Sequence, residues 1–414
     1  MKQEIKDRIE QINNGIVPEG YRSTSIGVLP EDWNVKKLKD VAEEITERAG
    51  TNKYETLSIS AGIGFVNQAK KFGKELSGKQ YEKYTVLKKG DFSYNKGNSK
   101  KYPQGCIYML KDRECAAVPN VFESFRFNSD YSGYYEQLFI LGFHNKQLYA
   151  KINHGVRDDG LLNLNGKDFY SINLPQPPLK VQKKIAEILS TQDKVIELKE
   201  KLIEQVHLQM KFLMQQLCTT DKHCINCKLG ECIMEVDERT TENNQYDILS
   251  VTKDGIKKQS DHFNHQIASA DNTNYKIIKK NQLALSILNL WMGSLDVLKT
   301  CDVGIISPAY KVFDFNSNLM LPDFGKYFLR SYNMIWLYNM NSETGASVVR
   351  KNLDLNSLLN SLITIPKIDE QRKIATILTK KGREILLLEQ ELEQEKQKKK
   401  ALMQLLLTGI VRIK

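Results

Sequence analysis

The stretch that decides the fold runs from Leu174 to Leu217 and reads LPQPPLKVQKKIAEILSTQDKVIELKEKLIEQVHLQMKFLMQQL. A second copy, from Ile365 to Leu406, reads IPKIDEQRKIATILTKKGREILLLEQELEQEKQKKKALMQLL. The residues that recur unchanged at a constant offset of 189 are Gln182, Lys184, Ile185, Ala186, Ile188, Leu189, Leu213, Met214, Gln215 and Leu217. A register kept over roughly thirty residues indicates duplication of a long element. The sequence therefore predicts two similar halves.

Each copy has the pattern of a long amphipathic helix. Apolar residues recur every seven positions in the first copy, at Leu189, Ile196, Ile203, Met210 and Leu217. The second copy repeats this row at Leu378, Ile385, Leu392 and Leu406, and Lys399 interrupts it. Such a heptad seam is typical of a coiled coil, and a helix from Val181 to Leu217 is about 55 Å long. We expect an antiparallel pair within the chain; a coiled coil that dimerises two chains is the alternative.

Length and composition favour two ordinary domains. The chain has 414 residues, which is too long for one core. Of these residues 41% are hydrophobic and 27% are charged, an ordinary composition for a folded protein. No run of about 18 apolar residues and no signal-peptide pattern occurs, so we expect a cytoplasmic protein. The net charge of +10 suits a polyanionic partner, although many basic proteins bind none.

The segments between the long helices repeat as well. Strand patterns at 54–59 and 84–92 return at 246–251 and 275–283, and each is followed by a helical stretch, at 134–149 and 324–340. Strands, a helix and a further strand predict an α+β fold with two similar mixed domains, separated by the coiled coil and related by a pseudo-twofold axis. The expected division is an N-terminal helix at 1–14 that packs against the C-terminal region, a first domain at 15–172, a central helix at 173–218, a second domain at 219–364 and a C-terminal helix at 365–414.

Signatures of metal binding and catalysis are weak. Cys218, Cys224, Cys227 and Cys232 lie close together, but one C-x-x-C with two further cysteines is not the usual zinc spacing, so reduced thiols in a linker fit better. His262 and His265 beside Asp261 lack a third ligand and fit a polar loop. A phosphate-binding G-x-x-x-x-G-K-[ST] loop is absent, and 307–310 reads as a turn rather than a methyltransferase motif. We expect no enzyme activity, no metal and no cofactor.

The arrangement resembles the DNA-specificity subunits of type I restriction-modification systems. The resemblance rests on YRSTSIGVLPEDW at 21–33, on LPQPPLKVQKKIAEIL and IPKIDEQRKIATIL, and on Leu407-Thr408-Gly409 with Arg412. It covers essentially the whole chain. Two features depart from the family: the cysteine-rich segment has no family role, and the first copy has two more residues than the second between its proline and glutamine.

The resemblance implies a function and partners. Each variable domain would bind one half of a split double-stranded DNA target, and the paired helices would set the gap. Methyltransferase subunits, two in number, would dock on the helices, motor-nuclease subunits would join them, and this chain would perform no chemistry. A coiled-coil scaffold with an incidental basic surface is the alternative from another class.

Candidate DNA contacts are amides that suit adenine and cations that suit guanine or phosphate. In the first domain these are Lys70, Lys71, Tyr94, Asn95, Lys96, Asn98, Lys100, Lys101 and Arg157. In the second domain they are Lys257, Lys258, Asn289, Trp291, Arg350 and Lys351. For the loop that starts at Tyr94 the alternative is a solvated hairpin, and Trp291 is alternatively a core residue. Arg157 and Arg350 each follow a glycine, but could equally cap a helix, and Arg157 could pair with Asp158.

Overall fold

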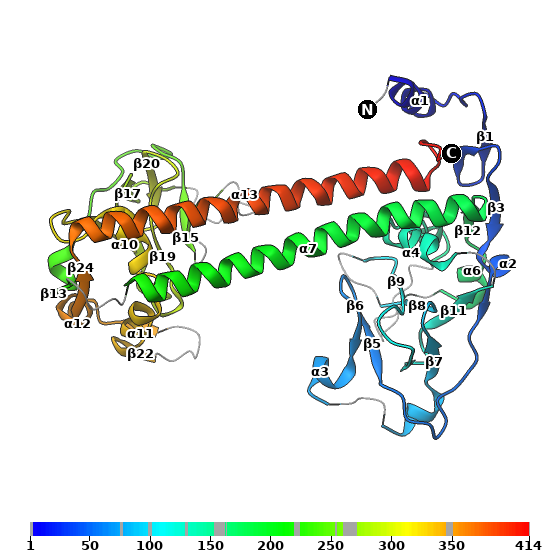
Figure 1. The fold of residues 1–414 in the computed structure, drawn as a ribbon, viewed down its shortest axis with the longest axis horizontal. Helices are drawn as coiled ribbons and strands as arrows, with labels where there is room; N and C mark the ends of the chain where they lie inside the picture. Colours follow the sequence, from blue (N-terminus) through cyan, green and yellow to red (C-terminus); the bar gives the residue numbers. More distant parts are fainter. Residues whose placement is uncertain are drawn as a thin grey trace. The chain divides into compact units, whose positions relative to one another are not determined.

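The computed structural model describes residues 3–74, 78–97, 102–128, 131–152, 162, 164–218, 224–252, 255–259, 271–344 and 351–413 (Figure 1). The chain divides into two compact units. Unit 1 comprises Met1–Leu198 and Leu392–Lys414, and unit 2 comprises Lys199–Glu391. Each unit therefore holds one mixed domain together with a part of each long helix.

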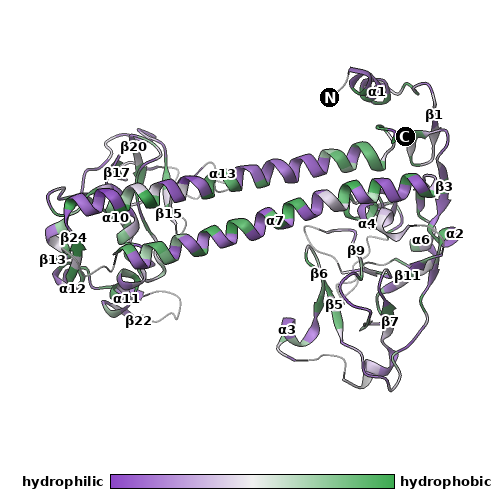
Figure 2. Cartoon of the chain, in the orientation of Figure 1, coloured by the Kyte–Doolittle hydropathy of each residue, from purple (hydrophilic) through white to green (hydrophobic). Residues whose placement is uncertain are grey.

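The two predicted long helices are present and pair in opposite directions. α7 (Leu179–Cys218) and α13 (Ile368–Leu407) have 40 residues each, or about 60 Å. Cross-helix bonds join Gln192 to Glu395 at 2.6 Å in unit 1 and Lys199 to Glu391 at 2.6 Å in unit 2. Residue numbers rise along one helix as they fall along the other, so the helices form an antiparallel coiled coil within the chain. Hydrophilic and hydrophobic residues alternate along both helices in Figure 2.

The first domain is built on a four-stranded antiparallel sheet. Its order is β4 (Ala42–Glu44), β11 (Glu123–Phe127), β8 (Phe92–Asn95) and β9 (Cys106–Met109). Two-stranded pairs surround it: β1 (Tyr21–Thr24) with β2 (Gly27–Pro30), β3 (Asn34–Lys37) with β12 (Asn173–Gln176), β5 (Leu57–Ser60) with β6 (Gly64–Asn67), and β7 (Thr85–Lys88) with β10 (Cys115–Val118). The helices are α1 (Gln3–Asn13), α2 (Leu38–Val41), α3 (Gln68–Phe72), η1 (Gly78–Lys83), α4 (Ser132–Ile140), α5 (Asn145–Tyr149) and α6 (Gly166–Tyr170).

The second domain repeats the four-stranded sheet and three of the four strand pairs, whereas the fourth pair of each domain lies at a different place in the order of the elements. Its sheet has the order β14 (Ile233–Val236), β21 (Tyr310–Phe315), β18 (Leu283–Ser286) and β19 (Leu295–Val297). The pairs are β13 (Cys224–Lys228) with β24 (Leu362–Pro366), β15 (Leu249–Thr252) with β16 (Gly255–Lys258), β17 (Lys276–Lys279) with β20 (Val303–Ile306), and β22 (Ser342–Thr344) with β23 (Lys351–Leu353). The helices are α8 (Leu229–Cys232), η2 (Leu290–Met292), α10 (Pro322–Phe328), α11 (Tyr332–Met340) and α12 (Leu355–Asn360). The predicted α+β fold with two similar domains is confirmed, and the pseudo-twofold relation stays a prediction.

Each domain shares its core with the long helices. In the first domain, aromatic residues of the sheet such as Phe92 and Phe125 belong to one buried cluster with Leu189 of α7 and Leu406 of α13. In the second domain, Leu378 of α13 joins the corresponding cluster. Burying apolar surface contributes about 25 cal/mol per Å², so each domain is stabilised by the helix pair as well as by its own sheet.

A buried glutamine at the start of each long helix explains one of the repeated residues. Gln182 accepts a hydrogen bond from the backbone nitrogen of Tyr131 at 3.1 Å, and Gln371 accepts one from that of Leu321 at 2.9 Å. Both glutamines are fully buried. Since Tyr131 and Leu321 precede α4 and α10, each glutamine ties a domain helix to a long helix.

The N-terminal segment and the C-terminal residues contact each other within unit 1. The hydroxyl of Tyr21 donates to the carbonyl oxygen of Gly409 at 2.8 Å, and Arg8 donates to that of Ile410 at 2.6 Å. Arg412 pairs with Asp32 at 2.8 Å. We call these contacts the terminal clamp. The apolar stripe of α1, formed by isoleucines, is only half-buried, so Arg8 carries the contact between α1 and the C-terminal residues.

Two expectations about the domains are wrong in detail. The stretches 134–149 and 324–340 are each two helices rather than one, separated after α4 by a turn at Gly142 (φ +77°) and after α10 by residues 329–331. The stretches 84–92 and 275–283 each hold a strand, a turn and the first residue of a second strand.

The cysteine-rich segment is part of the second domain rather than a linker. β13 pairs with β24, and the sulfur atoms of Cys227 and Cys232 lie 3.4 Å apart in the buried core. Cys227 occupies the place of Lys36, and Cys232 that of Val41, in the corresponding strand and helix of the first domain. Burial raises the pKa of both thiols.

Candidate nucleic-acid interface

In the first domain, the loop after β8 contributes fewer candidate contacts than the sequence predicted. Tyr94 is fully buried: its ring stacks on Phe169 with centroids 4.6 Å apart, and its hydroxyl donates to the carbonyl oxygen of Gln104 at 2.8 Å. Burial raises the pKa of Tyr94. A tyrosine on an inner strand of the sheet packs in the core, and Tyr94 is therefore withdrawn as a DNA contact.

The next two residues of this loop are engaged within the domain. Asn95 accepts a hydrogen bond from the backbone nitrogen of Gly97 at 2.9 Å, which closes a turn. Lys96 is half-buried and pairs with Glu123 at 2.6 Å. The predicted contacts Asn98, Lys100 and Lys101 lie outside the described residues, as does Arg157. Asn95 and Lys96 thus shape the loop, and its outermost part is not described.

The lysines of α3 are exposed, as a contact to phosphate requires. Asn67 caps α3 by accepting a hydrogen bond from the backbone nitrogen of Lys70 at 3.0 Å, and Gly73 ends the helix with φ +72°. Lys70 and Lys71 lie on this short helix directly after the β5–β6 hairpin. Cations fixed by a capped helix at the end of a hairpin can contact a phosphate backbone.

The tip of the β5–β6 hairpin adds a residue that the sequence analysis missed. Ile63 is 75% exposed, and the neighbouring backbone nitrogen of Gly62 donates to the hydroxyl of Tyr108 at 2.8 Å. Burial raises the pKa of Tyr108 to about 12, so the hydroxyl stays protonated at neutral pH. The signal in the sequence was an isoleucine between two glycines in a turn.

In the second domain, the structure brings two predicted contacts together. The ammonium group of Lys351 lies 5.1 Å from the centroid of the Trp291 ring and 3.0 Å from the amide oxygen of Asn339. The indole nitrogen of Trp291 is buried and has no hydrogen-bond partner in the described part of the chain. Asn289 directly precedes η2, which carries Trp291. Trp291 is half-buried, between the two roles predicted for it.

Two other predicted cations of this domain, Lys257 and Lys258, lie on β16. Lys257 and Lys258 are exposed, and Lys258 pairs with Asp247 at 2.6 Å. Arg350 lies outside the described residues.

An exposed apolar row on α11 was also missed. Tyr332, Trp336 and Met340 are 67%, 55% and 66% exposed, while Met334 and Tyr338 on the opposite face are buried. The row follows the four-residue spacing of one helix face. The spacing is visible in the sequence, but which face of the helix meets the core is not.

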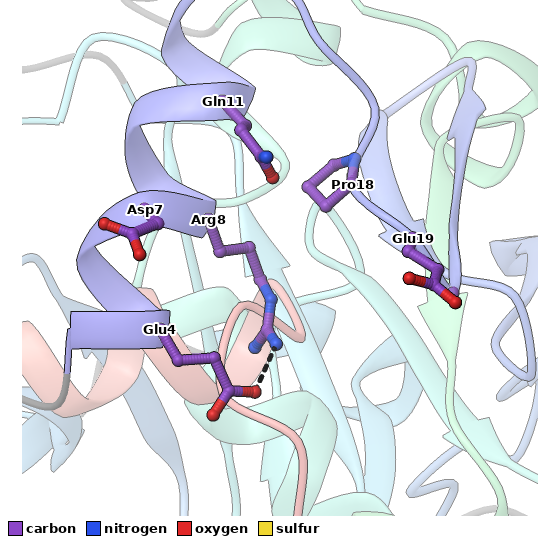
Figure 3. Close-up of a pocket in the computed structure, with 7 residues that line it drawn as sticks. Glu4, Asp7, Arg8, Gln11, Pro18 and Glu19 are labelled. Atoms are coloured by element: carbon purple, nitrogen blue, oxygen red, sulfur yellow. Dashed lines mark hydrogen bonds and ion pairs between the residues drawn. The ribbon is translucent and has the colours of Figure 1, made fainter.

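A hollow of about 500 Å³ lies beside α1, away from these candidates in the sequence (Figure 3). Three carboxylates line it, from Glu4, Asp7 and Glu19. Arg8 pairs with Glu4, one turn earlier on α1, at 3.2 Å. With acidic lining and its one arginine already paired, this hollow does not suit a phosphate backbone.

Two weak signatures from the sequence are accounted for in the described residues. No group of three or more His, Cys, Asp or Glu side chains that could hold a metal ion is found among them. The segment 307–310 is a turn closed by a hydrogen bond from the backbone nitrogen of Tyr310 to the carbonyl oxygen of Ser307 at 3.0 Å, as predicted. In the described part of the chain no helix is long and apolar enough to cross a membrane.

Comparison with known proteins shows which proteins the chain resembles. The family model "Type I restriction modification DNA specificity domain" matches residues 30–208. The chain is 25% identical to a protein of Methanocaldococcus jannaschii described as the type I restriction enzyme MjaX specificity subunit, over 96% of this chain and 97% of that protein. It is also 25% identical to the MjaVIII specificity subunit of the same organism, over 63% of this chain and 67% of that one.

A solved structure shows the same fold. A chain from a structural study of the assembly and conformational transition of a type I restriction-modification system superposes with a TM-score of 0.57. The alignment covers 92% of this chain and 99% of that chain at 14% identity. Residues 30–208 thus resemble the DNA specificity domain of type I restriction-modification systems, and nearly the whole chain is similar in sequence to a specificity subunit of such a system.

Proposed function

We propose that each of the two domains binds one half of a split, asymmetric DNA target and that the α7–α13 pair sets the gap between the halves. The observation that carries this proposal is a repeated framework with unlike surfaces. The strand order and the buried glutamines recur, whereas Tyr332, Trp336 and Met340 correspond to Gly142, Lys146 and Ala150 in the first domain. Two modules of one fold with different exposed residues suit two different half-sites.

The domain division that we propose is the one expected from the sequence, with recognition domains at 15–172 and 219–364. Lys70, Lys71 and Ile63 in the first domain, and Lys351, Trp291 and Lys257 in the second, are the described residues best placed to contact DNA. Cations would position the phosphate backbone, and the neighbouring side chains would read base edges.

Repeated exposed apolar residues support docking of two like partners. Ile188 on α7 and Ile377 on α13 are 37% and 45% exposed, and both stand at the same place in the repeat. Leu198 and Leu387 form a second such couple, at 56% and 50%. Since the same positions stay apolar and uncovered in both halves, we assign them to two methyltransferase subunits. Motor-nuclease subunits would join that complex.

The deciding experiment is selection from random DNA duplexes by the chain assembled with its methyltransferase partner. We expect enrichment of a motif with two unlike halves and a fixed gap. If no sequence were enriched, a scaffold with an incidental basic surface would explain the chain better. Methylation by the chain alone would point instead to an enzyme.

Exchange of one domain tests the modular part of the proposal. Replacing residues 15–172 with the corresponding domain of another family member should change one half of the enriched motif and leave the other half and the gap unchanged. Loss of both halves in a complex that still assembles would contradict independent reading by the two domains.

A further inference from the structure

One charged pair interrupts the apolar seam of the long helices. Lys399 stands where the heptad row Leu378, Ile385, Leu392 and Leu406 predicts an apolar residue, and its side chain is only 13% exposed. It donates a hydrogen bond to one carboxylate oxygen of Asp193 on α7. A largely buried lysine is costly unless it is paired, so the pairing of α7 with α13 at this point depends on Asp193 facing Lys399.

The same aspartate also fixes the first domain. Its other carboxylate oxygen accepts a hydrogen bond from the side-chain nitrogen of Gln137 on α4 at 3.1 Å, and Gln137 is 1% exposed. The residue before Asp193, buried Gln192, donates to Glu395 at 2.6 Å, and Glu395 lies one turn before Lys399 on α13. The network therefore joins α4, α7 and α13.

A second ion pair borders the network. Lys111 pairs with Glu136 on α4 at 2.5 Å. Burial raises the pKa of Glu136, the negative charge of Asp193 raises it further, and Lys111 and Lys399 lower it. The four charges thus balance one another within one partly dry region.

The duplicated half lacks this network. At the repeat offset of 189, Asp193 corresponds to Gly382 and Lys399 to Met210. Tyr131 and Leu321, whose backbone nitrogens bond the buried glutamines, correspond to each other, so Gln137 corresponds to Tyr327. The hydroxyl of Tyr327 bonds that of Thr379 at 3.3 Å. Since the second half has the same fold without this network, the network is not required for the fold that the two halves share.

The position of the pair distinguishes one helix register from the next. If α13 slid by one heptad along α7, Asp193 would face Leu392 or Leu406 instead of Lys399, and the apolar residues of the seam would still meet apolar residues. A uniform apolar seam tolerates such slips, whereas a single polar position in a seam specifies the register, at some cost in stability.

We propose that Asp193 and Lys399, with Gln137, form a register lock that selects one alignment of α7 on α13 and seats the first domain on it. The proposal deepens the proposed function, in which the helix pair sets the gap in the DNA target. These residues are positioning residues and touch no DNA.

The test measures the helix register directly. Lys399→Met keeps the seam filled, with the residue found at the equivalent position. Lys380→Met removes an exposed lysine elsewhere on α13 as the control. Spin labels on genetically encoded residues at exposed positions 191 and 400, chosen because seven native cysteines complicate thiol labelling, report the distance between the helices.

The expected result is a second population for one variant only. The wild type and Lys380→Met should give a single distance. Lys399→Met should add a second distance, because in that population α13 has moved along α7 by about 10 Å, the length of one heptad. The double variant Asp193→Lys with Lys399→Asp restores an opposite pair, and the amide of Gln137 can accept as well as donate, so the single distance should return.

Two further readouts separate the outcomes. A single wild-type distance in Lys399→Met, with or without lower stability, would overturn the lock. With methyltransferase partner bound, Lys399→Met should also accept DNA targets whose gap differs by about three base pairs, since 10 Å spans that many steps. A changed distance with unchanged gap preference would uphold the lock and count against the helices as the ruler.

Discussion

At the scale of single residues, His144 carries the clearest link between burial and pH. It lies in the core of the first domain, with neither ring nitrogen hydrogen-bonded to any described residue and with the ring of Phe139 at 5.5 Å. Burial lowers its pKa from 6.5 to about 4. The folded chain therefore holds a neutral imidazole over a pH range in which the unfolded chain binds a proton.

This difference predicts a loss of stability in mild acid. The stability that neutral His144 contributes is fully present above pH 6.5 and is lost as the pH falls toward 4. Between pH 7.5 and 5.0 the free energy of unfolding should fall by about 2 kcal/mol. His144→Met, which introduces the residue found at the corresponding place in the second domain (Met334), should remove that loss. Urea unfolding at the two pH values measures it. His207→Met, at an exposed histidine of α7, is the matched control.

Gly409 is the residue on which the terminal clamp depends most. Its φ is +71°, and an added Cβ would lie 2.5 Å from the ring of Pro30. Gly409→Ala should lower the free energy of unfolding by more than 2 kcal/mol, because left-handed backbone costs an alanine about 1 kcal/mol and the clash adds to it.

Gly15→Ala separates the two costs. Gly15 has a φ of +75° but no atom within 4 Å of an added Cβ, so only the backbone term applies there. Hydrogen exchange at residues 21–33 should increase in Gly409→Ala and stay near the wild-type value in Gly15→Ala. Equal effects of the two substitutions would mean that the clamp contributes little.

The candidate contacts show how far sequence reasoning reaches at this scale. Residue type alone predicted Lys70 and Lys71 as exposed cations, because charged side chains rarely enter a core. The same reasoning failed for Tyr94, since a tyrosine suits both a core and an interface. Only the stacked Phe169, distant in sequence, decides between the two.

At the scale of elements, the buried glutamines give a prediction for both halves. Gln371 donates to the carbonyl oxygens of Pro366 and Leu319 and accepts from the backbone nitrogen of Leu321. Gln371→Ala leaves buried backbone groups unpaired, at about 1–3 kcal/mol each, so unfolding should become easier by at least 2 kcal/mol. Gln390→Ala, at an exposed position of the same helix, should change stability by less than about 0.5 kcal/mol in the same denaturation assay.

The long helices could be predicted because their information is local. A period of seven held over many turns fixes the helix, its buried face and its need for a partner. The ends of the helices in the two domains could not be predicted from such a local pattern. Gly142 ends one of them in left-handed backbone, and nothing within the segment 134–149 distinguishes that glycine from one tolerated inside a helix.

The prediction that the cysteine-rich segment is a linker failed for a different reason. β13 is a strand because it pairs with β24, which lies more than a hundred residues later in the chain. Its short pattern resembles a linker until that partner is known. Pairing between distant strands is the part of this fold that one sequence does not reveal.

At the scale of the whole molecule, a matched insertion tests the helices as a ruler. One heptad added after Lys199 and one after Gln390 keeps the seam in phase and lengthens both helices by about 10 Å. The selected DNA gap should grow by about three base pairs while both half-site sequences persist. Selection from random duplexes with the methyltransferase partner measures both. New half-sites with the old gap would contradict the ruler.

The core that the first domain shares with the end of α13 also has a consequence for biosynthesis. The first domain shares its core with Met403, Leu406 and Leu407, residues translated some two hundred positions after α7 begins. At about 5–20 residues per second, Ile185 and Leu189 leave the ribosome roughly 10–40 seconds before their partners exist. The domain that is synthesised first is thus completed last. Until then its part of α7 exposes an apolar face on the nascent chain, and chaperones can bind that face.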